Sequence, residues 1–377
     1  MNRYDVIIAG GGLIGASIAF ELACHGMKVA VFDAQEPGKE ASWASAGMIS
    51  PAPEGPGMIP LVAPGLASAA LYPDFVRTVE ALSGQKVGYR PKGILDVLLS
   101  GEAQHELSTR LALYHGLGIK AEAVSAEKSR EWEPGITEDF VGAIYRPDEA
   151  SVDNRALTKA TVEAARRKGV EVVSGRAATA IWTDGKRCKG LNFANERAEA
   201  DWTIIAAGCF SQQIEGVAPY APVFPTKGQM AALRCDVKIE RVLWSERIYL
   251  VPRTDGRIIA GATAEHAGFD RRVTAGSLKK ILSGAIELVP AMVNAQVEET
   301  WAGLRPDTPD HLPILGPTDL EGLLIATGHF RSGILLAPIT AKWMREWITT
   351  QSVSLEWERF SPMRFLEARE RLGAKEK

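Results

Sequence analysis

A glycine-rich segment near the N-terminus has residue types and spacing suited to binding a dinucleotide. Gly10, Gly12 and Gly15 follow the apolar run 4–9, which is typical of a buried strand, and precede helical spacing over 13–25. The first glycine permits a tight turn, the second lets the backbone approach a pyrophosphate, and the third lets the helix pack on the strand. The free amides and the dipole of the helix N-terminus attract phosphate.

An acidic residue at the end of the next apolar run supports the same interpretation. Residues 28–32 form a second predicted strand that leads into Asp33. A carboxylate at this strand tip is placed to accept hydrogen bonds from ribose hydroxyls. A glycine-rich turn can also be purely structural, but here strand, glycines, helix, strand and acid occur in order. The motif by itself does not choose FAD over NAD.

Two segments late in the chain favour FAD. The run 201–206 is a predicted buried strand, followed by Ala207 and Gly208, small residues that let backbone approach the same cofactor. A further strand over 322–326 leads through a short loop into a helix over about 334–347. The N-terminal dipole of this helix could stabilise the negative charge of a reduced flavin.

The segment 41–48 (ASWASAGM) fits the same picture. Its small residues, together with Met48, suit a backbone wall against a flat ring. Taken alone, it is equally well an ordinary loop of alanines and serines.

With these segments in place, the sequence resembles the D-amino-acid oxidase superfamily of FAD-dependent oxidoreductases, and within it the bacterial glycine oxidases. The resemblance runs from about residue 4 to about residue 338. It is carried by GGGLIGASIAFELA at 10–23, ASAGM at 44–48, YLVPR at 249–253, AGAT at 260–263, WAGLRP at 301–306 and GHFRSGILLAP at 328–338.

The resemblance implies roles for particular residues. Arg305 would bind the substrate carboxylate, Tyr249 would share that carboxylate, and Arg331 would lie near the pocket. The alternatives are a buried arginine paired with a structural carboxylate, a strand tyrosine in a core, and a solvated loop arginine. The expected FAD contacts are Gly10, Gly12, Leu13, Ile14, Gly15, Asp33, Ser42, Ser45, Ala46, Gly47, Met48, Ala178, Ala207, Gly208, His329, Phe330, Arg331, Ser332, Gly333, Ile334 and Leu335.

Two positions depart from the family's pattern and place strict glycine preference in doubt. Arg247 stands where the family usually has histidine, and Ala264 stands where it usually has methionine. With Met48, we expect both to line the substrate pocket. Together they would broaden it towards larger or acidic D-amino acids. The proline-rich stretch 51–64 replaces a more polar, helical segment, so the entrance would differ as well.

The activity that the resemblance implies is oxidative deamination of glycine and small D-amino acids. Hydride would pass from Cα to flavin N5, and the products would be a 2-oxo acid, ammonia and hydrogen peroxide. The motifs offer no histidine or carboxylate base, so water would take the amine proton. No cysteine follows Cys235, so we expect non-covalent FAD. The resemblance also suggests a homo-oligomer and a link to thiamine biosynthesis, where glycine imine feeds thiazole formation.

Three alternatives stay open at this point. The first is a dehydrogenase of the same fold, which would act on D-amino acids, N-methyl amines or 2-hydroxy acids with an acceptor other than oxygen. The second is an NAD- or NADPH-linked reductase, although the sequence shows no second nicotinamide-binding unit and no CxxC. The third is a non-catalytic flavoprotein.

Composition excludes several other classes. The 377 residues carry a formal charge of −3, which gives no basic surplus for nucleic acid or an anionic membrane. Four scattered cysteines and six histidines without ligand spacing predict neither a disulfide scaffold nor a metal site, and a reducing cytoplasm is the default. The uncharged stretch 55–72 contains three prolines, so we expect an apolar loop rather than a membrane-spanning helix.

The predicted fold is a Rossmann-like α/β domain with a discontinuous α+β domain. We expect an FAD-binding domain from 1–85, 145–220 and 300–365, a substrate-binding domain from 86–144 and 221–299, and a charged tail at 366–377. Asp153 should cap a helix over 154–168, followed by a strand of the first sheet. The expected antiparallel strands of the second domain are 94–99, 223–235, 248–252 and 257–263, with helices at 103–115 and 277–288.

Overall fold

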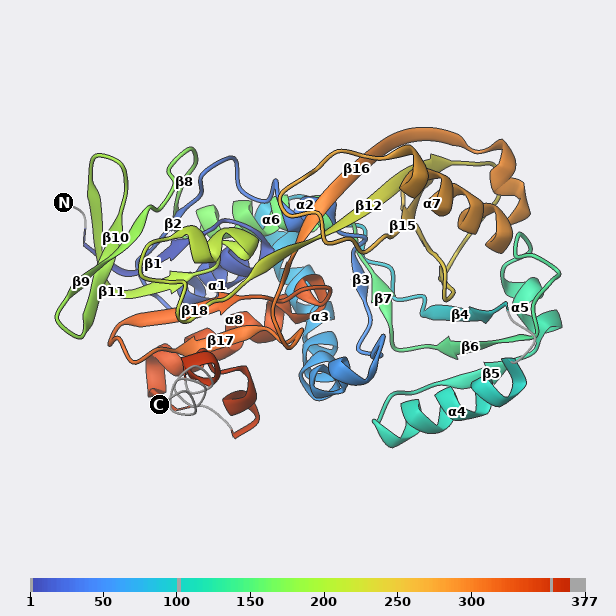
Figure 1. Ribbon diagram of the computed structural model, residues 1–377, viewed down its shortest axis with the longest axis horizontal. Helices are drawn as coiled ribbons and strands as arrows, with labels where there is room; N and C mark the ends of the chain where they lie inside the picture. Colours follow the sequence, from blue (N-terminus) through green and yellow to red (C-terminus); the bar gives the residue numbers. More distant parts are fainter. Residues whose placement is uncertain (1–2, 100–102, 353–354, 367–377) are drawn as a thin grey trace, which may run out of the picture.

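The computed structural model describes residues 3–99, 103–352 and 355–366. Two large sheets occupy opposite ends of an elongated molecule, and the long strands β12 and β16 run between them (Figure 1). Nearly all of the charged tail predicted at 366–377 lies outside the described residues.

The first sheet is the predicted Rossmann-like sheet. Its main path runs β17-β18-β11-β1-β2-β8, and its pairs are parallel except β17–β18. The strands are β1 (Tyr4–Ala9), β2 (Val29–Phe32), β8 (Glu171–Val173), β11 (Arg197–Ile205), β17 (Ile314–Pro317) and β18 (Leu323–Thr327). Two antiparallel strands, β9 (Ala180–Asp184) and β10 (Arg187–Asn192), extend it from β11. The strands are nearly continuous apolar runs because both faces of a parallel sheet are covered.

Helices α1 (Leu13–Cys24), α6 (Asn154–Arg167) and α8 (Gly333–Thr350) pack together against this sheet. The cap predicted for the middle helix is confirmed, because the side chain of Asp153 accepts a hydrogen bond from the Ala156 amide. The strand predicted after it is β8, which pairs in parallel with β2. Their packed faces form one apolar core that also includes the buried side chains of β1.

The prediction of an apolar loop over 55–72 is wrong. The segment forms the 3-10 helix η1 (Pro56–Leu61) and the first half of α3 (Val62–Ser83). Pro56 opens η1 and Pro64 lies in the first turn of α3, where backbone amides have no acceptor within the helix. A proline at such a position does not prevent a helix from forming.

The stretch Pro56–Ser83 is long and apolar enough to cross a membrane by length and composition, with 39% of its most apolar window buried. In the fold, α3 packs on α6 and α8. Pro338 lacks the amide that would bond to the Ile334 carbonyl, and the hydroxyl of Tyr72 donates to that carbonyl instead. The hydroxyl of Ser68 donates to the Leu335 carbonyl at 2.5 Å. α3 therefore acts as a core helix that fixes the start of α8.

The second sheet runs β16-β12-β15-β14-β13-β4-β6-β5. Its strands are β4 (Ile94–Leu98), β5 (Glu122–Val124), β6 (Gly142–Arg146), β12 (Phe224–Arg234), β13 (Val242–Trp244), β14 (Tyr249–Pro252), β15 (Arg257–Gly261) and β16 (Gln296–Asp307). The predicted antiparallel arrangement holds except for the parallel pair β4–β13. Helices α4 (Ala103–Gly116), α5 (Ala126–Trp132) and α7 (Ala275–Leu288) pack on it.

The expected domain boundaries at 145 and 300 fall inside β6 and β16, both strands of the second sheet. The division into two domains otherwise stays a prediction.

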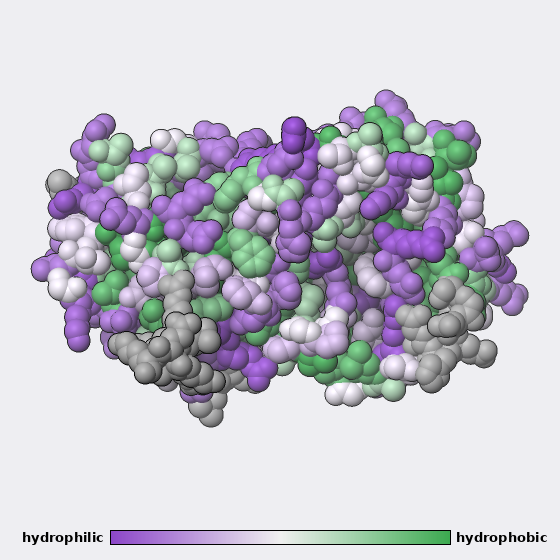
Figure 2. Space-filling model, viewed as in Figure 1, coloured by the Kyte–Doolittle hydropathy of each residue, from purple (hydrophilic) through white to green (hydrophobic). Residues whose placement is uncertain are grey.

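A short sheet of β3 (Met48–Ile49) and β7 (Ala150–Ser151) lies between the halves, next to helix α2 (Ala41–Ala44) and its following loop. On the face in Figure 2, hydrophilic side chains are spread over both halves.

Strands β12 and β16 extend from the second sheet towards the first sheet. They pair along almost their whole length, and Thr226 lies opposite Arg305. The side chain of Thr226 is fixed by Asp307, with its hydroxyl 2.9 Å from that carboxylate. This pairing sets where Arg305 lies relative to the glycine-rich loop.

Candidate active site

A cavity of about 350 Å³, called the main cavity below, lies where the two halves meet. One wall comes from the carboxyl ends of β1, β2, β11 and β18 and from the segment 40–48. The opposite wall comes from β12, β14 and β16. Ligands of open α/β sheets bind at the carboxyl ends of strands, and ligand cavities often lie between domains.

The glycine-rich loop leaves no room for larger residues. Gly10 has φ +105°, and a Cβ there would lie 2.5 Å from the Ala206 carbonyl oxygen. A Cβ on Gly15 would lie 2.0 Å from the Gly10 carbonyl oxygen, so this glycine lets α1 pack directly on the loop. The hydroxyl of Ser42 accepts from the Leu13 amide at 2.9 Å, which joins the start of α1 to the segment 40–48.

Asp33 supports the loop as well as lining the main cavity. Its carboxylate accepts hydrogen bonds from the Gly11 amide at 2.7 Å and from the Gln35 amide at 2.9 Å. Burial is the largest influence on this group and raises the pKa of Asp33, while the two amides oppose that shift. The carboxylate thus fixes the turn that the sequence predicts for phosphate binding.

Carbonyl groups of the segment 42–46 are held in place from three directions. Asn154 donates to the carbonyls of Ser42 at 2.7 Å and Trp43 at 2.9 Å. The Trp301 indole donates to the Ala44 carbonyl at 3.0 Å, and Arg253 donates to the Ala46 carbonyl at 2.8 Å.

The side chains behind this segment are themselves fixed. Arg253 also donates to the Val152 carbonyl at 3.0 Å and to the Asn154 side chain at 2.9 Å, and burial lowers the pKa of its guanidinium to about 10. The guanidinium of Arg155 lies 3.7 Å from the centre of the Trp43 ring and pairs with Glu299. The segment therefore forms a rigid wall of backbone and small side chains.

Arg305 and Tyr249 face each other in the opposite wall. Arg305 donates to the Thr263 carbonyl at 3.0 Å, and it forms no ion pair with the described residues. Its guanidinium fits because position 228 is glycine, where a Cβ would lie 2.3 Å from a guanidinium nitrogen. Burial lowers the pKa of Arg305 and raises the pKa of Tyr249, although each group opposes the shift of the other.

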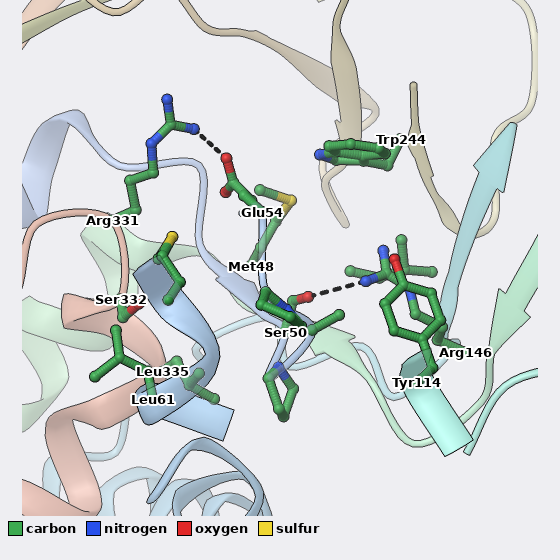
Figure 3. Close-up of a pocket in the computed structure, with 15 residues that line it drawn as sticks. Met48, Ser50, Glu54, Leu61, Tyr114, Arg146, Trp244, Arg331, Ser332 and Leu335 are labelled. Carbon is green, nitrogen blue, oxygen red and sulfur yellow. Dashed lines mark hydrogen bonds and ion pairs between the residues drawn. The ribbon is translucent and has the colours of Figure 1, made fainter. Parts of the chain in front are cut away.

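Arg331 and His329 lie in the loop before α8. Arg331 forms an ion pair with Glu54 (Figure 3), and both residues also line the main cavity. His329 is 3% exposed, and its ring lies 3.1 Å from the Thr340 hydroxyl. Burial lowers the pKa of His329 to about 3, so the ring is neutral at physiological pH.

Most of the residues predicted from the sequence come together in the main cavity. They are Gly10, Gly12, Leu13, Ile14, Asp33, Ser42, Ser45, Ala46, Met48, Ala178, Ala207, Gly208, Tyr249, Arg305, His329, Phe330, Arg331, Gly333 and Ile334. Gly15 and Gly47 do not line it but permit close packing, since a Cβ on Gly47 would lie 2.0 Å from the Val152 carbonyl oxygen. Ser332 and Leu335 line a neighbouring cavity instead.

The structure does not place Arg247 or Ala264 in the lining of the main cavity. Arg247 is exposed at the end of the β13–β14 turn and pairs with Glu287 of α7 at 2.8 Å. Ala264 is exposed in the loop that follows β15. Neither side chain lines the main cavity, so the structure gives no support to the broadened pocket expected from these two residues.

Several residues of the site were not expected from the sequence. Glu54 lies in the proline-rich stretch 51–64, and Asn154 and Arg155 lie at the start of α6 behind the wall at 42–46. Arg253 belongs to the motif YLVPR, but nothing in that motif indicates that its side chain holds a carbonyl two hundred residues away. Each of these residues meets its partner only through packing between segments that are far apart in the chain.

The residues present fit a flavin dinucleotide. In the cradle formed by Gly10, Gly12 and Gly15, a Cβ on Gly10 or Gly15 would clash with backbone atoms, and a Cβ on Gly12 would lie 3.2 Å from the Ser42 hydroxyl. Helices α1 and α8 both begin at the main cavity, and neither N-cap residue caps its helix with a side chain. Apart from the Leu13 amide, which donates to the Ser42 hydroxyl, their first amides are available to negatively charged groups. Asp33 stands at the tip of β2, where a ribose is expected.

Comparison with known proteins agrees with this geometry. A family model described as FAD dependent oxidoreductase matches residues 5–347. Glycine oxidase of Geobacillus kaustophilus is 32% identical over 97% of this chain and 98% of its own length. The crystal structure of that organism's glycine oxidase superposes with a TM-score of 0.90, over 96% of this chain and 98% of the other.

Other relatives have different names. The bifunctional protein ThiO/ThiG of Synechocystis is 37% identical over 96% of this chain, which spans 54% of that relative's length. The hydrogen cyanide synthase subunit HcnC of Pseudomonas aeruginosa is 31% identical over 97% of both chains. Because the family model covers most of the chain and full-length relatives exceed 30% identity, this chain belongs to the FAD-dependent oxidoreductase family and is an enzyme that uses FAD.

Proposed function

We propose that the protein is an oxidase of glycine and small D-amino acids, which it converts to a 2-oxo acid, ammonia and hydrogen peroxide. The observation that carries this proposal is the pair Arg305 and Tyr249, which faces the main cavity opposite the glycine-rich loop. The likeness to glycine oxidases over nearly the whole chain supports it.

Arg305 is suited to hold the substrate carboxylate. A guanidinium can form two parallel hydrogen bonds with a carboxylate, and it stays charged when buried. In the described structure its charge is not matched by a carboxylate at ion-pair distance, and one nitrogen is fixed by the Thr263 carbonyl. The alternative of a structural arginine paired with an acid finds no such acid among the described residues. A substrate carboxylate would supply the missing negative charge.

Tyr249 supplies a further donor. Because burial raises the pKa of its phenol, the hydroxyl keeps its proton at physiological pH and can donate it to the carboxylate. Two fixed groups on one carboxylate orient the rest of the substrate, and holding reacting groups in a suitable geometry provides a large part of many enzymatic rates. When bound, FAD supplies the hydride acceptor that the protein side chains lack.

Proton removal from the substrate amine is assigned to water. His329 is buried and bonded to Thr340, and burial lowers its pKa to about 3, so it is a poor proton acceptor at neutral pH. Glu54 lines the main cavity, but Arg331 pairs with it. This agrees with the sequence, which offers no base within its motifs.

The names of the relatives suggest a use for the product. The relative from Synechocystis is named bifunctional protein ThiO/ThiG, and this chain spans 54% of its length. We assign the reaction to thiamine biosynthesis, in which the imine of glycine would be passed on for thiazole formation. The same likeness leaves a role in amino-acid catabolism as the alternative outcome.

An anaerobic titration tests the proposed function. Purified protein with FAD receives glycine, D-alanine, L-alanine, sarcosine or lactate in separate samples, and the flavin absorbance bands are followed. We expect glycine and D-alanine to bleach the flavin, and we expect air to restore the bands with release of hydrogen peroxide. Bleaching by lactate alone, or a failure of air to restore colour, would favour a dehydrogenase. If no substrate bleaches the flavin, the proposal is wrong.

A further inference from the structure

A second cavity of about 60 Å³, called the side cavity below, adjoins the main cavity. Met48, Glu54 and Arg331 line both. In Figure 3, Arg331 and Glu54 lie on one side of the side cavity, and Trp244, Tyr114 and Arg146 lie on the other. A cavity of this size holds several water molecules, which is room for a short polar side chain.

Arg146 is a buried cation beside this space that has few partners. The residue is 4% exposed, and its Nε forms no hydrogen bond with the described residues. One Nη contacts the Ser50 hydroxyl and the Glu149 carboxylate, but only at 3.5 Å and 3.4 Å. Its guanidinium also lies 5.5 Å from the centre of the Tyr114 ring. Buried donors are almost always satisfied, so these weak contacts need an explanation.

The charges around the side cavity leave room for one more acceptor. Glu149 faces Arg146 directly, but its Oε2 also lacks a hydrogen bond. Asp96 is bonded by Arg110, and Glu54 is paired with Arg331. The negative charges of Asp96 and Glu54 are therefore already balanced by Arg110 and Arg331. An acceptor oxygen placed in the side cavity would therefore meet a guanidinium donor without displacing an existing strong pair.

We propose that the side cavity is a substrate side-chain subsite, in which Arg146 receives a side chain that ends in a carboxylate or carboxamide. This proposal rests on the proposed function, because it takes the α-carboxylate of the same substrate to be held by Arg305. The side chain passes Met48 and the Glu54–Arg331 pair, which separate the two cavities. Ser50 adds a hydroxyl beside Arg146, while Trp244 and Leu335 enclose the methylene groups.

Substrate specificity tests this subsite. We expect kcat/KM for D-aspartate or D-glutamate to exceed that for D-leucine, which has a similar size without acceptor oxygens, by at least about tenfold, the order expected of a charge-assisted hydrogen bond. In Arg146→Met/Glu149→Gln, which removes both charges together, this ratio should fall by about tenfold. Equal use of the acidic substrates and D-leucine by the unaltered protein would overturn the proposal.

A matched variant controls for the loss of a buried ion pair. Arg241 pairs with the buried Glu133 at 3.2 Å in the same half of the molecule, and neither residue lines either cavity. We expect Arg241→Met/Glu133→Gln to leave the specificity ratio within about twofold. If both double variants lower the ratio equally, the effect is structural and the subsite is rejected.

A binding experiment separates this proposal from the proposed function. Succinate and glutarate are D-aspartate and D-glutamate without the amino group, so they can bind but cannot be deaminated. Flavin absorbance is titrated with them and with butyrate and pentanoate. We expect the dicarboxylates to bind at least tenfold more tightly, and we expect Arg146→Met/Glu149→Gln to abolish the difference. If no amino acid is oxidised but this difference is found, the subsite stands and the proposed function fails. If glycine is oxidised and the difference is absent, the subsite fails.

Discussion

The wall of the main cavity around the glycine-rich loop is made of backbone and small side chains. The opposite part of the cavity, called the substrate end below, contains Tyr249, Arg305 and the pair of Arg331 and Glu54, which come from distant segments. At the loop, Gly10 and Gly15 bring backbone atoms within contact distance of each other. At the substrate end, Arg305 comes from β16, and the pair of Arg331 and Glu54 joins segments far apart in the chain.

This difference indicates how each region tolerates change. The loop depends on empty space at fixed backbone positions, so an added methyl group should disturb it. The substrate end depends on charge and donor geometry, so a change of side-chain chemistry at constant volume should disturb it. Replacements in the first region should therefore change FAD binding, and those in the second should change turnover.

The largest effect is expected at Arg305. Arg305→Leu removes the guanidinium that holds the substrate carboxylate, and kcat/KM for glycine should fall by about 10³-fold, through lost binding and lost orientation. Arg305→Lys keeps a charge without the two-pronged geometry, so its loss should be smaller but still clear. Steady-state peroxide formation measures both, and FAD content is measured in the same samples. A loss below tenfold in Arg305→Leu would contradict the assigned role.

The next effect tests the opposite region. In Gly10→Ala the new methyl group would lie 2.5 Å from the Ala206 carbonyl oxygen, at φ +105°. Gly10 and Ala206 both line the main cavity, where FAD is expected, so we expect the Kd for FAD to rise by about 10²-fold or more, a loss of about 3 kcal/mol. FAD fluorescence on titration measures the Kd.

Gly26→Ala is the matched control for this change. Gly26 also has a positive φ, of +83°, but a Cβ there meets nothing within 4 Å. The control therefore carries similar backbone strain, of about 1 kcal/mol, without the clash. If the two variants bind FAD equally, strain rather than space governs the loop, and the contrast between the two regions is wrong.

The contrast also explains how much could be predicted from the sequence. The loop, the strands on either side of it and the cap at Asp153 depend on residues close together in the chain, and the structure confirms these elements. The helix α3 was missed because three prolines suggested a loop, although Pro56 and Pro64 occupy first turns. A proline is tolerated in the first turn of a helix but disrupts its interior. The sequence alone does not show where the helix begins, so it does not show which case applies.

The substrate end was predicted less well, for a physical reason. Arg305 and Tyr249 were identified through motifs that resemble a family, but their partners were not. Arg247 was expected in the pocket because it stands where the family usually has histidine, yet it lies in the turn before β14 and pairs with Glu287 at the surface. Glu54 and Arg253 make contacts across hundreds of residues. Such pairings follow from tertiary packing rather than from local spacing.

Tyr249 provides a smaller test of the substrate end. Tyr249→Phe removes one hydroxyl donor and keeps the ring, so kcat/KM for glycine should fall by about tenfold, equivalent to about 1.4 kcal/mol. FAD content should not change, because the ring still fills its place beside Gly261. If Tyr249→Phe loses FAD but retains its turnover per bound flavin, the side chain supports the cofactor rather than the substrate.

The smallest expected effect concerns His329, a titratable residue in the loop before α8. Burial lowers the pKa of folded His329 to about 3, whereas an unfolded histidine titrates near 6.5. As the pH falls below about 6.5 the unfolded chain takes up a proton that the folded chain refuses, so stability decreases. This residue alone should lower the free energy of unfolding by about 0.8 kcal/mol at pH 6 relative to pH 8. His329→Gln should reduce the pH dependence of the unfolding free energy by that amount. An unchanged pH dependence in His329→Gln would mean that the ring accepts a proton in the folded state, and it would then return as a candidate base for the substrate amine.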